Sequence, residues 1–141
     1  MAEVRVHPLS PNDLDEALVL AQLGSNSLDP DRWRRDALAR LRDPATGGIL
    51  VASSSSGRLC GLLTYRVVPS RDARPSLEVE RLVAFDLLHP RPIADALIAE
   101  VVILARVQDC DSLRLVQPFD APEDATALVL ASGVGDLHSV F

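Results

Sequence analysis

The sequence predicts a mixed α/β fold with a central, mostly antiparallel sheet and helices on both of its faces. Short segments with alternating or continuous apolar residues, typical of strands, alternate with longer segments whose apolar residues recur every three or four positions, typical of helices. A polar run ending in Gly57 joins two apolar segments and predicts a hairpin of antiparallel strands. Further along, the order strand, helix, strand predicts a βαβ-like unit.

The composition is that of a soluble protein that forms a single domain over residues 1–141. Of the 141 residues, 48% are apolar and 24% are charged. A formal net charge of −6 argues against nucleic acid or an anionic membrane as a partner, because basic residues supply most of the affinity for both. All 14 basic residues are arginine, which excludes Schiff-base chemistry on a lysine. Residues 1–13 lack the apolar segment of a signal peptide, so we expect a cytoplasmic protein.

The sequence predicts no metal site. Cys60 and Cys110 lie far apart in apolar surroundings, and neither is part of a metal-type spacing. His7, His89 and His138 are isolated from one another. We therefore expect two reduced cysteines in the core and no bound metal.

The first helix follows a strand at residues 3–8. Ser10 is a helix cap, Pro11 suits a first helical position, and Gly24 is placed to end the helix.

A second helix begins after Asp29, and one of its faces is charged. That face carries Arg32, Arg35, Asp36 and Arg40, and we expect it to be exposed to solvent. The hairpin follows, with strands at residues 49–53 and 59–68 joined by a serine-rich turn. Within the second strand, Gly61 indicates a bulge or a close backbone approach.

Strict alternation divides the next strand, residues 77–85, into two faces. One face carries Glu78, Glu80, Leu82 and Ala84. A long apolar helix is predicted at residues 93–107, a strand at 112–117, a short helix at 123–131 and at most one brief strand at 136–141.

Two stretches resemble the GNAT superfamily of acetyl-CoA-dependent N-acyltransferases. The first is Glu80-Arg81-Leu82-Val83-Ala84 with the loop and the helix start Ile93-Ala94-Asp95-Ala96-Leu97. The second is ATALVLASGV at residues 125–134, which is similar to a late helix of the family. The resemblance implies acetyl-CoA or another acyl-CoA as co-substrate and an unknown small-molecule or peptide amine as acceptor.

The resemblance also implies roles for particular residues. Backbone groups of Leu82, Val83 and Ala84 would line the pantetheine arm and polarise the thioester carbonyl. Glu78 or Glu80 would be the catalytic base, with Glu78 slightly ahead on position, unless the two are only paired with arginines on a solvated face. The pyrophosphate would meet the loop and the helix start, at Pro90, Arg91, Pro92, Ile93, Ala94 and Asp95. For Arg91, plain surface exposure is the alternative to a phosphate contact.

The chain departs from the family's pattern in the loop and on the late helix. His89 stands where the family has Arg or Gln, and Pro90 and Pro92 stand where it usually has Gly. Each proline removes an N–H donor and fixes φ. Val129 occupies the position of the family's tyrosine acid, and Pro122 that of a frequent asparagine.

Asp95 is expected in the first helical turn, where it suits the helix dipole without a ligand but would repel a pyrophosphate. Two functions therefore stay open. One is an N-acyltransferase with a degenerate pyrophosphate loop. The other is a non-catalytic dimerisation or regulatory module that has lost CoA binding. The chain's end leaves room for one strand where the family has two, and a homodimer would cover the resulting sheet edge.

Overall fold

The computed structural model describes residues 4–24, 27–71, 74–86, 91–110 and 112–115. Its elements are β1 (Arg5–Pro8), the short 3-10 helix η1 (Pro11–Asp13), α1 (Leu14–Gly24), α2 (Pro30–Arg42), β2 (Gly47–Ser53), β3 (Leu59–Val68), β4 (Ser76–Ala84), α3 (Arg91–Val107) and β5 (Ser112–Leu115). The helix predicted at residues 123–131 and the strand predicted at 136–141 lie outside the described residues.

The described strands form one sheet in the order β1-β2-β3-β4-β5. The pairs β1–β2, β2–β3 and β3–β4 are antiparallel, whereas β4 and β5 are parallel. Helix α3 connects the two parallel strands, as a parallel pair requires, so β4, α3 and β5 form the predicted βαβ-like unit. The predicted mixed α/β fold with a mostly antiparallel sheet is confirmed.

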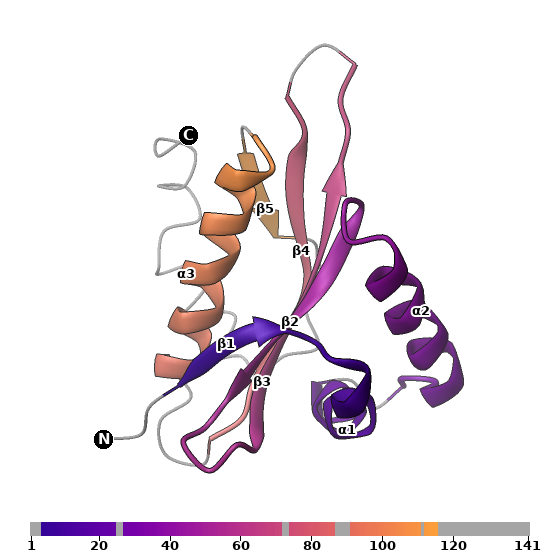
Figure 1. The fold of residues 1–141 in the computed structure, drawn as a ribbon, viewed down its shortest axis with the longest axis vertical. Helices are drawn as coiled ribbons and strands as arrows, with labels where there is room; N and C mark the ends of the chain where they lie inside the picture. The colour runs from indigo at the N-terminus through magenta and orange to yellow at the C-terminus, as the bar shows by residue number, and fades with distance from the viewer. Residues whose placement is uncertain (1–3, 25–26, 72–73, 87–90, 111, 116–141) are drawn as a thin grey trace.

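Helices cover both faces of the sheet. Figure 1 shows α3 on one side and α1 and α2 on the other. Beneath α3, the buried strand residues include Leu50, Leu63, Leu77 and Leu82, which form one cluster with Leu97 and Val101 of α3. On the opposite face, Val51 and Leu62 form a second cluster with Leu18, Ala21 and Trp33 of α1 and α2. Strands β2 and β3 therefore contribute alternate residues to the two halves of the core.

Both predicted helix starts are capped. The Ser10 hydroxyl accepts a hydrogen bond from the Asn12 N–H at 3.3 Å. At the start of α2, Oδ1 of Asp29 accepts from the N–H groups of Asp31, at 3.0 Å, and Arg32, at 3.4 Å. Pro30 occupies the first helical position, where no N–H is needed. The Asp29 carboxylate is thus committed to the helix cap.

The serine-rich run is a turn, as predicted. Between β2 and β3, the Ser54 N–H donates to the Arg58 carbonyl at 2.9 Å, and the Ser54 and Ser56 hydroxyls lie 2.8 Å apart. Gly57 has a φ of +86°, a conformation that favours glycine. These hydroxyls therefore serve the hairpin.

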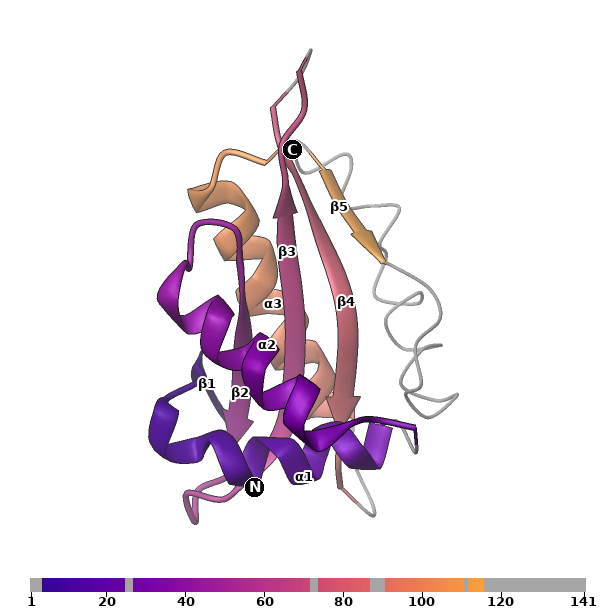
Figure 2. The same cartoon turned by 90° about the vertical axis from the view of Figure 1, so that its right-hand side faces the viewer.

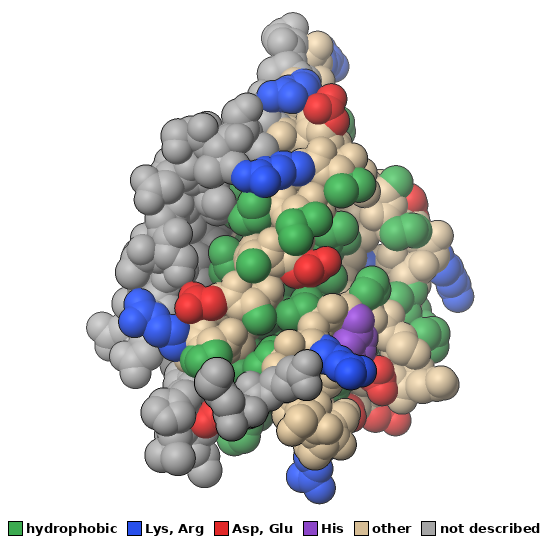
Figure 3. Space-filling model, turned by 60° about the vertical axis from the view of Figure 1, so that its left-hand side comes forward, with side chains coloured by type: hydrophobic (Ala, Val, Ile, Leu, Met, Phe, Trp, Pro, Cys, Tyr) green, Lys and Arg blue, Asp and Glu red, His purple; other side chains and the backbone are tan. Residues whose placement is uncertain are grey.

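The outward face of α3 carries exposed apolar side chains among charged ones (Figure 3). Ile103 is 51% exposed and Val107 is 73% exposed.

The predicted homodimer stays a prediction. Among the described residues, no helix is long and apolar enough to cross a membrane.

Candidate functional site

Strand β4 contains one more residue than its antiparallel partner needs. Thr64 of β3 pairs with Arg81, but the next β3 residue, Tyr65, pairs with Val79. Glu80 is therefore the extra residue of a β-bulge, opposite no residue of β3. Bulges locally re-aim side chains, and they are common beside functional sites.

The bulge changes which β4 side chains face each layer of helices. Four residues share the α3 side of the sheet: Leu77, Val79, Leu82 and Ala84. The prediction that Leu82 and Ala84 share the face of the two glutamates is therefore wrong, because the extra residue reverses the alternation after position 80. Glu80 and Arg81, consecutive in the chain, both line a pocket on the α2 side.

Beyond the bulge, a described strand pairs with only one edge of β4. Strand β5 pairs with residues 76–79 and ends at Leu115. Figure 2 shows the two strands side by side at the start of β4 and farther apart at the end of β5. For residues 81–84, the only partner within the described part of the chain is β3. Among the described residues, the carboxyl end of β4 thus has an open edge where two parallel strands separate, a favoured place for ligands in α/β sheets.

Backbone groups of the three predicted strand residues divide between the two edges. The Phe85 N–H donates to the Cys60 carbonyl of β3 at 2.8 Å. In an antiparallel strand, alternate residues direct their N–H and C=O groups to opposite neighbours. The groups of Val83 therefore face β3, whereas those of Leu82 and Ala84 face the open edge.

Helix α3 begins close to the end of β4. Arg91 is its first residue, with an exposed side chain, and Pro92 is the second. The side chains of Ile93 and Ala94 are buried in the core, so only their backbones are available to a ligand. At a helix start, the first N–H groups have no partner within the helix, and here Arg91 and Ile93 supply such donors.

Other predicted residues of this region lie elsewhere or outside the described residues. Because α3 begins at Arg91, Asp95 lies in the second helical turn and not, as predicted, in the first. Its side chain is exposed. His89 and Pro90 lie outside the described residues, as do Pro122 and Val129.

Gly61 fixes the position of α3 on the sheet. A Cβ atom at this position would lie 2.6 Å from Cγ2 of Ile93 and 3.0 Å from Cδ1 of Leu97. Gly61 pairs with Ala84 at the end of β4. The predicted close approach at Gly61 is thus confirmed, and it seats the start of α3 next to the open edge.

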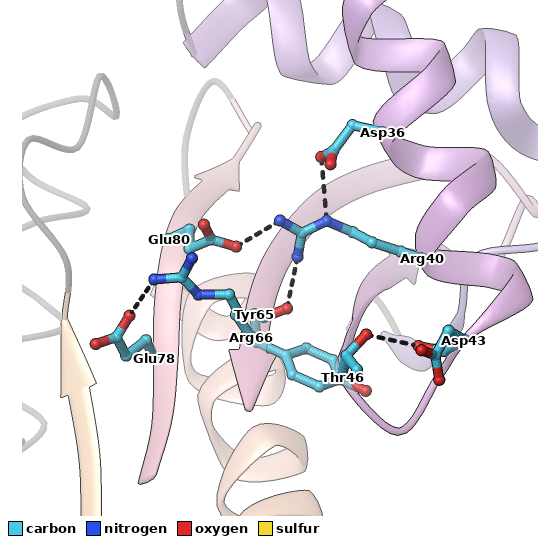
Figure 4. A network of polar contacts seen from close by, with 8 residues as sticks. All are labelled: Asp36, Arg40, Asp43, Thr46, Tyr65, Arg66, Glu78 and Glu80. Atoms are coloured by element: carbon cyan, nitrogen blue, oxygen red, sulfur yellow. Dashed lines mark hydrogen bonds and ion pairs between the residues drawn. The ribbon is translucent and has the colours of Figure 1, made fainter. Parts of the chain in front are cut away.

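Arg40 of α2 ties the helix to the bulge (Figure 4). One guanidinium nitrogen donates to Oε1 of Glu80 at 2.6 Å and another to the Tyr65 carbonyl, also at 2.6 Å. The third nitrogen donates to Asp36 at 3.1 Å. The Arg40 side chain is only 15% exposed. The prediction that this whole helix face is solvated is wrong for Arg40.

The two candidate catalytic glutamates have different surroundings. Glu78 accepts a hydrogen bond at 2.9 Å from Arg66, on the neighbouring strand, and its side chain is 13% exposed. The hydrogen bond to Glu78, and then the negative charges of Glu80 and Glu78, raise the pKa of Arg66. Glu80 lines the pocket beside α2, and Glu78 does not. Oε1 of Glu80 accepts a hydrogen bond from Arg40, and Oε2 has no hydrogen-bond partner among the described residues.

The pocket lies between the start of α2 and the bulge, with a volume of about 510 Å³. It is lined by Ser27, Leu28, Asp29, Arg32, Trp33, Asp36, Arg40, Thr64, Glu80 and Arg81. Trp33 is buried and forms part of the pocket wall. The pocket places the Glu80 carboxylate in a space large enough for a small molecule.

Known structures share this fold, although no family model and no curated protein matches the chain. The aminoglycoside N-acetyltransferase AAC(6')-Iy in complex with CoA has a TM-score of 0.79 at 15% identity, over 96% of this chain and 88% of that one. The AAC(6')-Ih 6'-N-acetyltransferase from Acinetobacter baumannii has a TM-score of 0.71 at 16% identity, over 94% and 90%. The ribosomal-protein-alanine N-acetyltransferase from Brucella melitensis biovar Abortus 2308 has 0.72 at 22%, over 89% and 87%. The chain has the GNAT fold.

Within this GNAT fold, burial raises the pKa values of two titratable side chains, Tyr65 and Cys60. Burial raises the pKa of the Tyr65 phenol, and the nearby Arg40 charge partly opposes that rise. Burial, and then the negative charge of Asp86, raise the pKa of the Cys60 thiol. A raised thiol pKa means little thiolate at neutral pH, so Cys60 is a poor nucleophile. The described residues contain no group of His, Cys, Asp and Glu arranged to hold a metal ion.

Sequence reasoning missed three arginines that line the pocket of this GNAT fold, namely Arg32, Arg40 and Arg81. The first two lie on a charged helix face, and such a face predicts exposure to solvent. The sequence of α2 alone does not indicate that Arg40 contacts Glu80, 40 residues further along the chain. The adjacent Glu80-Arg81 pair was a usable signal. A charged pair in an otherwise alternating strand is what a bulge accommodates, because two consecutive residues can then share the polar face.

Proposed function

We propose that the protein is an N-acyltransferase that moves an acyl group from acetyl-CoA, or another acyl-CoA, to a small amine. This proposal rests on two features of β4 at and beyond its bulge. On one side it sends Glu80 into a pocket, and beyond it Leu82 and Ala84 present backbone groups at an open edge that leads to the start of α3. The fold is that of acetyltransferases, two of them aminoglycoside-modifying enzymes.

The acyl-CoA would lie along the open edge of β4. The free N–H and C=O groups of Leu82 and Ala84 suit the amide groups of a pantetheine arm, in the way that an added strand binds a sheet edge. An N–H aimed at the thioester oxygen would stabilise the negative charge that develops there. The pyrophosphate would meet the start of α3, with the N–H groups of Arg91 and Ile93 and the exposed Arg91 side chain as donors. Since Pro92 supplies no N–H, we expect weak CoA binding.

Glu80 is the proposed base. Arg40 donates a hydrogen bond to Oε1 and thereby fixes the orientation of the carboxylate. Oε2 is then available to accept a proton from the acceptor amine. The acceptor ammonium gives one proton to Glu80, and the neutral amine attacks the thioester carbon. The C–N bond forms as the C–S bond breaks, and the second proton from the nitrogen neutralises the CoA thiolate. Glu80 then returns its proton to water.

Calorimetric titration with acetyl-CoA tests the donor half of this proposal. We expect binding by the wild-type protein, and about tenfold tighter binding by Pro92→Gly, which restores one N–H donor to the helix start. No heat from either protein at millimolar acetyl-CoA would overturn the proposal. Binding by the variant alone would favour the non-catalytic module, which the described geometry does not otherwise favour.

A further inference from the structure

The bulge brings opposite charges together on the pocket wall. Glu80 and Arg81 are neighbours in the chain, with Cα atoms about 3.8 Å apart. Both line the pocket, although consecutive strand residues ordinarily point to opposite faces. Across the pocket, α2 contributes Arg32 near the helix cap. The acceptor side thus contains a base and two guanidinium groups within the reach of one small molecule.

The negative charges of this pocket are already engaged. Asp29 caps α2 by accepting from two backbone N–H groups. Asp36 and Glu80 both accept hydrogen bonds from Arg40. Each of the pocket's three carboxylates therefore has a hydrogen-bond donor, either the Arg40 guanidinium or the start of α2.

Two of the positive charges, in contrast, are not engaged. Arg32 and Arg81 form no side-chain hydrogen bond or ion pair with any residue in the described part of the chain. Arg81 is partly buried on the sheet. A guanidinium presents a planar fork of donors that matches a carboxylate, so unengaged arginines beside a base provide recognition for an anionic group near the reacting amine.

We infer that the acceptor is a small amine that carries a carboxylate close to the amine, such as an amino acid. This inference rests on the proposed function. Arg81, with Arg32 opposite, binds the carboxylate, and the adjacent Glu80 receives the proton of the amine. A polyamine or an aminoglycoside fits less well, because the unengaged side-chain charges of the pocket are positive.

Matched acceptors test this inference. Free L-amino acids are compared with their carboxamides and with spermidine, and release of the CoA thiol from acetyl-CoA is followed. We expect the free acids to exceed their amides by about tenfold or more in kcat/KM, the value of one charge-assisted contact. Arg81→Gln should raise KM for the acids and leave the amides unchanged. Arg35→Gln, an exposed arginine of the same helix as Arg32 and outside the pocket lining, is the control and should change neither.

Direct binding separates this inference from the proposed function. The same acids and amides are titrated calorimetrically into the protein with and without CoA. Acid binding that Arg81→Gln removes supports the carboxylate site even if acetyl-CoA fails to bind and the acyltransferase proposal falls. Transfer to amides or spermidine at least as fast as to acids would overturn the inference while leaving the acyltransferase in place. Absence of acid binding at millimolar concentration in both titrations, or an equal loss for acids and amides in Arg81→Gln, would also overturn it.

Discussion

The two halves of β4 are built differently, and one inserted residue separates them. Residues 76–79 pair with β3 on one edge and β5 on the other, and the side chains of Leu77 and Val79 have no solvent exposure. Residues 81–84 pair with β3 alone within the described chain. The first half is therefore paired on both edges, and the second half has one edge without a partner strand among the described residues. The β-bulge at Glu80 marks the change between the two halves.

The same boundary separates the two candidate bases. Glu78, in the first half, pairs across the sheet with Arg66, so its contact is one between neighbouring strands. Glu80, at the boundary, is reached by Arg40 from outside the sheet. Because Arg40 belongs to α2, which packs on the sheet, the Glu80 carboxylate lies in the wall of the pocket between α2 and β4. This difference supports the proposal that Glu80, and not Glu78, is the base.

The largest effect is expected from filling the close approach at the end of the second half. In Gly61→Val, the new side chain would overlap Ile93 and Leu97, so α3 must move away from β3. We expect a loss of about 3 kcal/mol in the free energy of unfolding, measured by urea denaturation, with weaker acetyl-CoA binding.

Gly57→Ala provides the control for that substitution. No atom lies within 4 Å of a Cβ at Gly57, but its φ of +86° disfavours a side chain. Its cost should be about 1 kcal/mol and should come from the backbone alone. Equal losses in the two variants would show that α3 does not depend on the space at Gly61.

Removing Arg40 should loosen the boundary between the halves. Arg40→Met keeps most of the aliphatic stem but leaves the Tyr65 carbonyl and the Glu80 carboxylate without their donor. We expect a loss of about 2 kcal/mol in unfolding free energy, because these groups are partly buried.

Arg34→Met is the matched control on the same helix. Arg34 also contacts two carboxylates, those of Asp15 and Asp31, but its side chain is 42% exposed and theirs are 88% and 87% exposed. Exposed pairs contribute about 0–1 kcal/mol. A similar loss from both substitutions would mean that the bulge does not depend on Arg40.

Much of the fold could be predicted from the sequence, because its signals are local. The caps at Ser10 and Asp29 and the turn at Gly57 each depend on residues a few positions apart. The polar run between the two apolar segments likewise identified β2 and β3 as a hairpin. The βαβ-like unit followed from the order of strand and helix patterns along the chain.

The site was less predictable, because it depends on register and on distant contacts. Strict alternation placed Leu82 on the wrong face, since the position of a bulge is decided by how β3 and β4 pair. Arg40 reaches Glu80 across 40 positions of sequence, and nothing in the pattern of α2 distinguishes it from Arg35, which is exposed. Tertiary structure decides both points.

Replacing each glutamate by glutamine compares the contributions of Glu78 and Glu80 to catalysis. If the acyltransferase proposal holds, Glu80→Gln should lower kcat by about a hundredfold, the usual contribution of a general base. Glu78→Gln should change kcat by a factor of about three or less, since it weakens a partly exposed pair within the sheet. Steady-state kinetics with a saturating acceptor measures both, and the midpoint of urea unfolding shows whether either variant is destabilised. A larger loss for Glu78→Gln would reverse the assignment of the two residues.

The smallest effect concerns Tyr65, whose carbonyl Arg40 holds at the bulge. Burial raises the pKa of its phenol above the ordinary value of 10.0, and the charge of Arg40 lowers it in part. The unfolded chain therefore loses this proton before the folded protein does. The stability due to the neutral phenol is complete below about pH 10 and declines as the pH rises through the folded pKa. Tyr65→Phe should remove this part of the alkaline decline in unfolding free energy.

Tyr65 is the only tyrosine of the chain, so the ultraviolet absorbance of tyrosinate follows its titration without overlap from a second phenol. Arg40→Met should raise the Tyr65 pKa further, because the positive charge that favours tyrosinate is gone. Phe has no phenol to ionise, so the difference between wild type and Tyr65→Phe isolates the group from other alkaline titrations. A folded-state midpoint at or below the ordinary value would contradict the dominant effect of burial, and a downward shift in Arg40→Met would mean that the charge of Arg40 does not favour tyrosinate.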